Sequence, residues 1–70
     1  MYYQIGNNLT GPYSAPIASL EKAREVLETE ISAVAEGAIQ ESGGKLSREK
    51  ALEIARDHCW LCDENETIIN

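Results

Sequence analysis

A long run of apolar residues at helical spacing is the feature of this sequence that most constrains its fold. Between about Ile17 and Glu41, apolar side chains recur at intervals of three and four residues, which places them on one face of an α-helix. The stripe spans an arc of roughly 80° and comprises Leu20, Ala23, Leu27, Ile31, Val34 and Ala38. Ser42-Gly43-Gly44 follows, and glycine readily takes the left-handed conformation that ends many helices. These signals predict one long helix, with Ser14 or Ser19 as its N-cap.

A second, shorter helix is predicted directly after the glycines. Ser47 is a favourable N-cap residue, and Glu49 lies in the first turn of the helix that it would begin. Arg56 and His58 lie in the last turn, where positive charge complements the helix dipole. The sequence therefore predicts a helix of about 12 residues that ends just before Cys59.

Short strands are predicted on both sides of the two helices. Residues 2–5 and 59–62 are rich in β-prone side chains, and residues 67–69 follow a polar turn. Residues 9–13 predict at most a brief or edge strand, because Gly11-Pro12 cannot lie inside a central strand.

The order of these elements predicts an α+β fold. We expect a small antiparallel sheet of three to four short strands, with two helices, one of them long, packed on one face. With 70 residues, the chain has the length of a single domain, residues 1–70. It has no phenylalanine and four other aromatic residues, and so thin a core often needs a second chain for support.

The charge of the chain excludes several classes of partner. Twelve acidic and six basic residues give a net charge of −6 and a pI near 4.5. Such a surface repels phosphate backbones and anionic membranes, so we expect no direct nucleic-acid or membrane binding. The expected partner is a larger protein with a basic surface. Because the first residues lack the features of a signal peptide, we expect a cytoplasmic protein.

No motif in the sequence supports catalysis. There is no glycine-rich phosphate loop, nucleophile elbow or metalloprotease motif. His58 is the only histidine, and the neighbouring Asp57 points to another side of the predicted helix. We therefore expect a protein that is not an enzyme and that binds no cofactor.

The segment Cys59-Trp60-Leu61-Cys62 has the C-x-x-C spacing of redox and zinc sites. Here the pair follows a helix, whose partially negative C-terminal end raises a thiol pKa. In an extended segment the two cysteines also point to opposite faces of the sheet. We expect both to be reduced thiols that pack as small apolar side chains and bind no metal. A zinc site shared by two copies, or a redox site, is the less favoured alternative.

The best candidate for a binding surface is a row of glutamates on the long helix, namely Glu21, Glu25, Glu28 and Glu36. They fall within an arc of roughly 80°, nearly opposite the apolar stripe, along about 22 Å of helix axis. Residues 17–42 carry six acids and two bases. Carboxylates at this spacing can imitate nucleic-acid phosphates toward a basic groove, so we expect the row to bind the partner. A helix face that only contacts solvent is the alternative.

Part of the apolar stripe is expected to stay uncovered. The long helix should measure about 37 Å and the shorter one about 18 Å, so the shorter helix and a few strands cannot cover all of it. We expect Ile31, Val34 and Ala38 to remain exposed as an interface with a partner or a second copy. A structural homodimer that pairs its long helices is therefore the alternative function.

In small size, acidity and lack of catalytic groups or a secretion signal, the chain resembles the accessory proteins of phages and mobile elements. Among those it resembles the anti-CRISPR inhibitors, several of which present acidic surfaces to nucleic-acid sites. The resemblance concerns overall character and assigns no residue. It implies a non-enzymatic inhibitor that docks on a basic surface of a CRISPR-type complex, in the host cell cytoplasm if a phage encodes it.

Overall fold

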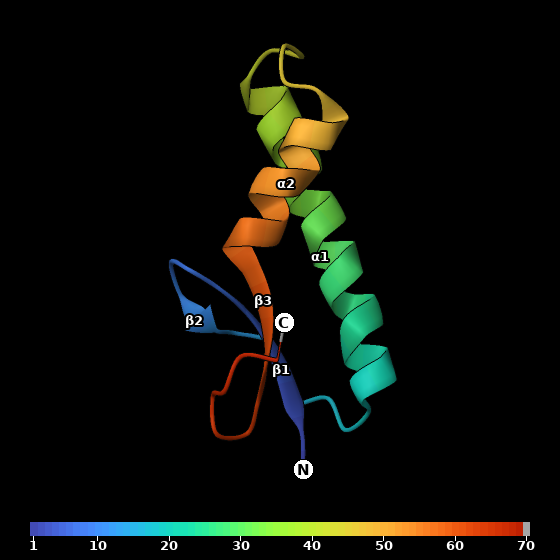
Figure 1. Cartoon of the computed structure of the whole chain (residues 1–70), viewed down its shortest axis with the longest axis vertical. Coiled ribbons are helices and arrows are strands. Elements are labelled where there is room, and N and C mark those ends of the chain that lie inside the picture. The colour runs from blue at the N-terminus through green and yellow to red at the C-terminus, as the bar shows by residue number, and fades with distance from the viewer. Residues whose placement is uncertain (70) are drawn as a thin grey trace.

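The computed structural model describes residues 1–69 and contains three strands and two helices within them (Figure 1). The strands are β1 (Tyr3–Asn7), β2 (Gly11–Pro12) and β3 (Cys59–Asp63), and the helices are α1 (Leu20–Glu41) and α2 (Arg48–His58). All neighbouring strands pair antiparallel, in the order β2-β1-β3. The predicted α+β class, with one long helix and a small antiparallel sheet, is confirmed. Residues 9–13, for which the sequence left open a brief strand, an edge strand or none, form the two-residue edge strand β2.

Serine hydroxyls cap both helices. The Oγ atoms of Ser19 and Ser47 each accept a hydrogen bond of 3.2 Å from the backbone amide three residues further on. The long helix begins at Leu20, later than the predicted Ile17. Ile17 instead exchanges two backbone hydrogen bonds of 2.8 Å with Tyr3, which extends the pairing along the edge of β1.

The two glycines after α1 reverse the chain direction. Gly43 and Gly44 have φ angles of 71° and 83°, a region that side chains with a Cβ rarely occupy. Their amides donate to the carbonyls of Gln40 and Ile39, which closes the last turn of the helix. The predicted glycine cap is confirmed, and α2 can therefore run back along α1.

The long helix contacts both the sheet and the second helix. In Figure 1 the N-terminal half of α1 lies beside β1 and β3, and its C-terminal half lies beside α2. The helical hairpin projects beyond the sheet, so the molecule is elongated, with extents of 41 × 21 × 17 Å. No residue separates the end of α2 from the start of β3.

The buried face of α1 is a row of residues four apart, namely Ala23, Leu27, Ile31 and Ala35. Each step of four advances the position by about 40° around the helix, so the row winds along α1 from the sheet toward α2. The small side chains of Ala51 and Ala55 allow α2 to approach closely, and both are fully buried. Ile5 of β1 and Leu61 of β3 complete the centre of the core.

Because the buried row winds around α1, the prediction that Ile31 stays exposed is wrong. Ile31 was expected to stay exposed, but only 3% of its surface is accessible, because it belongs to the buried row. Ala35 is buried in place of Val34, and Val34 and Ala38 are partly covered. The second helix thus covers more of the apolar stripe than helix lengths alone suggested.

The predicted final strand at residues 67–69 does not form. Cys62 and Ile68 make a single antiparallel bridge, flanked by two backbone hydrogen bonds of 3.1 and 2.8 Å. Glu66 takes a positive φ of 61°. After this turn, the chain lies beside β3 at one residue pair only, so no continuous ladder forms. The segment nevertheless packs alongside the end of β3, where Cys62 is fully buried.

Candidate functional site

All four glutamates of the predicted row are exposed, as expected. However, two of them face α2 and are engaged there. The buried row of α1 winds toward the side that carries Glu28 and Glu36, so these two flank it, whereas Glu21 and Glu25 lie nearly opposite Ala23 and Leu27. As a result, the row is not one continuous free surface.

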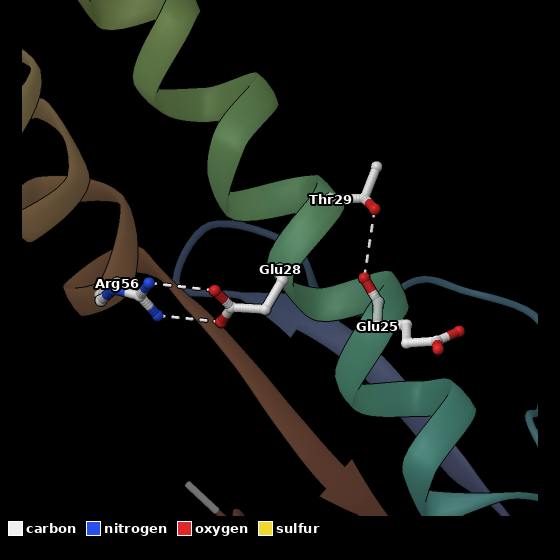
Figure 2. A network of polar contacts seen from close by, with 4 residues as sticks. All are labelled: Glu25, Glu28, Thr29 and Arg56. Carbon is white, nitrogen blue, oxygen red and sulfur yellow. Dashed lines mark hydrogen bonds and ion pairs between the residues drawn. The ribbon is translucent and has the colours of Figure 1, made fainter.

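Glu28 makes a two-pronged ion pair with α2, which Figure 2 shows from close by. The two guanidinium nitrogens of Arg56 donate to the two carboxylate oxygens of Glu28, at 2.9 and 3.0 Å. This hydrogen bond lowers the pKa of Glu28 and raises the pKa of Arg56. Both side chains remain more than half exposed, at 57% and 54%, so the pair contributes modestly to stability.

Glu36 also pairs with an arginine of α2, through a single contact in which Arg48 Nη1 donates to Glu36 Oε1 at the start of that helix. Glu28 and Glu36 are eight residues apart on α1, and Arg48 and Arg56 are eight residues apart on α2. The two ion pairs therefore lie two turns apart along the antiparallel hairpin. Glu28 and Glu36 are therefore exposed, as predicted, but each already pairs with an arginine of the same chain.

The N-terminal half of α1 borders an open depression of about 640 Å³. Glu21, Glu25 and Glu28 line it, together with Leu20 and Arg24. Three of the four predicted glutamates therefore lie around one surface feature, and Glu36 lies outside it. Arg24 adds a positive charge among the carboxylates, so the lining is mixed in charge.

Glu21 and Glu25 are the members of the row that no arginine of α2 engages within residues 1–69. Lys22 approaches the Glu25 carboxylate at 3.7 Å, and both side chains are 66% exposed. The backbone carbonyl of Glu25 accepts a hydrogen bond of 3.1 Å from the Thr29 hydroxyl (Figure 2). The Glu25 carboxylate itself points away from that bond, toward solvent.

The cysteine pair lies inside the protein. Cys59 and Cys62 are free thiols with 4% and 0% of their surface accessible. Burial, followed by nearby carboxylates, raises the pKa of both. Cys59 packs in the main core, whereas Cys62 alternates to the other face of β3. This placement agrees with the prediction that both pack as small apolar side chains.

Metal ligands do not gather elsewhere in the described part of the chain. Within residues 1–69, no group of three or more histidine, cysteine or acidic side chains is placed to hold a metal ion. His58 ends α2 partly covered, and its backbone carbonyl accepts a hydrogen bond of 3.1 Å from the amide of Asn8.

Sequence reasoning missed the arginines of α2 as determinants of the site. Their signal was present, because the eight-residue spacing of Arg48 and Arg56 equals that of Glu28 and Glu36. On two antiparallel helices, equal spacing allows both pairs to form in one register. That register becomes evident only when the hairpin is recognised as a pair of directly packed helices.

Across residues 1–69 no helix is long and apolar enough to span a membrane. No protein-family model, curated protein or solved structure matches this chain.

Proposed function

We propose that the chain is a non-enzymatic binding module that docks the N-terminal half of α1 on a basic surface of a larger protein. The observation that carries the proposal is the position of Glu21, Glu25 and Glu28 around one open depression on an exposed helix face. The net charge of −6 favours a basic partner over an acidic one.

The spacing of these carboxylates suits a surface that normally holds nucleic acid. Glu21 and Glu25 are about 6 Å apart along the helix axis, and Glu25 and Glu28 about 4.5 Å. Carboxylates at such intervals can occupy positions that phosphates take in a basic groove. The partner class that we propose is therefore a nucleic-acid-handling complex of anti-phage defence, of the CRISPR type, which the docked chain would inhibit.

The existing contacts of Glu21 and Glu25 leave their carboxylates available to a partner. The Lys22–Glu25 pair is long and exposed, and exposed pairs of this kind contribute about 0–1 kcal/mol. A lysine or arginine of the partner can therefore replace Lys22 at small cost. Glu28 is held by Arg56, so we assign the largest effect on binding to Glu21 and Glu25.

The test is a charge reversal of Glu21 and Glu25 to lysine, with a matched control on α2. Glu49→Lys with Glu53→Lys changes the net charge equally. Glu49 lies in the first turn of α2, as Glu21 does in α1, and Glu53 pairs with a lysine three residues before it, as Glu25 does. Only the position of the charge differs between the two variants.

Immobilised wild type is exposed to a nuclease-treated bacterial lysate, and captured proteins are identified by mass spectrometry. We expect a nucleic-acid-binding protein that single-stranded or duplex oligonucleotides displace. Its affinity should fall at least tenfold, about 1.4 kcal/mol, for E21K/E25K and change little for E49K/E53K. An equal loss of affinity in both variants would mean that only the overall charge matters, which contradicts a specific site at Glu21 and Glu25. Unchanged affinity of E21K/E25K would refute the proposal.

A further inference from the structure

The fold consists of two units that are joined at a single exposed loop. The N-terminal unit (residues 1–41) holds β1, β2 and α1, and the C-terminal unit (residues 48–69) holds α2 and β3. The tip loop (residues 42–47) connects them at the end of the molecule farthest from the sheet (Figure 1). Each unit completes the structure of the other, because β1 pairs with β3 and α1 packs on α2.

Polar contacts between the two units are numerous and specific. Besides the β1–β3 ladder and the two ion pairs, Asn8 joins the units at three points. Its amide donates to the carbonyl of His58 at 3.1 Å, and its Nδ2 donates to the carbonyl of Asp57 at 3.1 Å. Its Oδ1 accepts from Trp60 Nε1 at 3.0 Å. These contacts depend on the two units meeting, whichever copy of the chain supplies each.

The tip loop itself is bonded only locally. Ser42 Oγ donates to the carbonyl of Ile39 at 2.7 Å and accepts from the amide of Leu46 at 3.0 Å. Within residues 1–69, the hydrogen bonds of the tip loop stay inside the loop and the adjoining helix turns. Opening the loop therefore removes the packing of Leu46 against the core but none of the hydrogen bonds between the two units.

We propose that a second copy of this chain can supply the C-terminal unit, so that two copies exchange α2 and β3. In such a dimer Arg56 of one copy engages Glu28 of the other, and β3 of each copy pairs with β1 of its partner. Because the tip loop lies at the end opposite the sheet (Figure 1), an opened loop would leave the two sheets at opposite ends of the dimer. This inference is independent of the proposed function.

The geometry of the tip loop determines the equilibrium between the monomer and the exchanged dimer. In the monomer the tip loop holds the units at an effective concentration on the order of millimolar, so the wild type is monomeric at micromolar concentration. Reversal of the chain depends on Gly43 and Gly44, whose positive φ values few other residues adopt. Shortening the loop removes this reversal, and exchange then becomes the way to keep both units paired.

The first experiment deletes Gly43 and Gly44 from the full chain. Size-exclusion chromatography with light scattering at about 10 µM, well below the effective concentration of the tip loop, should give a folded dimer for the deletion and a monomer for the wild type. Circular dichroism checks that both are folded. A folded monomer of the deletion variant would overturn the proposal.

The second experiment uses two full-length charge variants, E28K/E36K and R48E/R56E, one of them labelled with ¹⁵N. In a monomer of either variant, the side chains of α1 and α2 that form the two ion pairs in the wild type carry charges of the same sign. In an exchanged heterodimer, both hairpins bring opposite charges together. After the two are unfolded and refolded together at about 1 mM, near the effective concentration of the tip loop, native mass spectrometry should show heterodimers at least tenfold above either homodimer. A statistical mixture of dimers, or two separate monomers, would overturn the exchange.

Discussion

The ring of Trp60 covers Gly6 on the neighbouring strand so closely that no other residue fits there. The two residues face each other across β1 and β3. A Cβ on Gly6 would lie 2.5 Å from the ring carbons Cζ3 and Cη2 of Trp60 and 2.8 Å from the carbonyl oxygen of Gly11. Since the carbonyl belongs to backbone, the clash cannot be relieved by a side-chain rotation alone.

Gly6→Ala should therefore destabilise the fold by about 1–3 kcal/mol, the usual cost of forcing an added methyl group into a filled core. Gly37 provides a matched control in α1, because a Cβ there meets nothing within 4 Å. Gly37→Ala should stabilise the protein by about 0.5–1 kcal/mol. Chemical denaturation followed by Trp60 fluorescence measures both, and effects of the same sign would contradict this account.

The two ion pairs between the helices should each contribute about 0.2–1 kcal/mol, because all four side chains are more than half exposed. Double-mutant cycles with Gln at Glu28 and Arg56, and at Glu36 and Arg48, measure the two coupling energies. Arg56 lowers the pKa of Glu28 from its ordinary value of 4.5. The Glu28 coupling should therefore be full above that value and be lost as the pH falls through the lowered pKa. A coupling that persists in strong acid would argue against this ion pair.

Both cysteine thiols should react slowly in the folded protein. Cys59 and Cys62 are buried, and burial raises the pKa of each, so little reactive thiolate reaches solvent at neutral pH. Alkylation by iodoacetamide should be slower by on the order of 100-fold or more than in the denatured chain. Mass spectrometry after timed labelling provides the measurement. Rapid labelling of one cysteine in native buffer would restore the redox alternative.

Stability should decline in alkali as Tyr13 loses its proton. Partial burial, followed by the hydrogen-bond and charge interactions with the Glu30 carboxylate, raises the pKa of Tyr13 from 10.0 to about 12, although 44% of its surface is exposed. The folded state therefore holds the proton more tightly than the unfolded state does. This contribution is fully present below pH 10 and is lost as the pH rises toward 12.

An ultraviolet titration of the Tyr2→Phe, Tyr3→Phe variant isolates the Tyr13 transition. Replacing Glu30 with Gln in the same background should move this transition back toward pH 10. If the Gln variant titrates at the same pH, the carboxylate has no part in the shift.

The helices were predictable because their signals are local. Ser19 and Ser47 lie directly before helical sequence, and Gly43 directly after it, so each end is determined by residues within one turn. The first strand and the shortness of β2 at Gly11–Pro12 also depend on neighbours in sequence. The prediction of a strand at residues 67–69 was wrong because it relied on β-prone side chains. Such side chains do not determine the conformation of the preceding turn, which sets how the segment lies against β3.

The candidate site was predicted only in part, because its free charges depend on contacts between distant residues. Exposure of Glu21 and Glu25 follows from helical periodicity. Neutralisation of Glu28 and Glu36 depends on arginines 28 and 12 residues away in sequence. The burial of Ile31 likewise depends on how closely the alanines of α2 let the two helices approach.

The direct passage from α2 into β3 has a consequence for how this chain can vary in length. An added residue anywhere within α2 would rotate everything after it by about 100°. It would also shift β3 by one position, which exchanges the faces of Trp60 and Leu61. Insertions and deletions between residues 48 and 63 should therefore be incompatible with the fold. Additions at the tip loop displace neither the helix nor the strand, so the hairpin end is where the chain can lengthen.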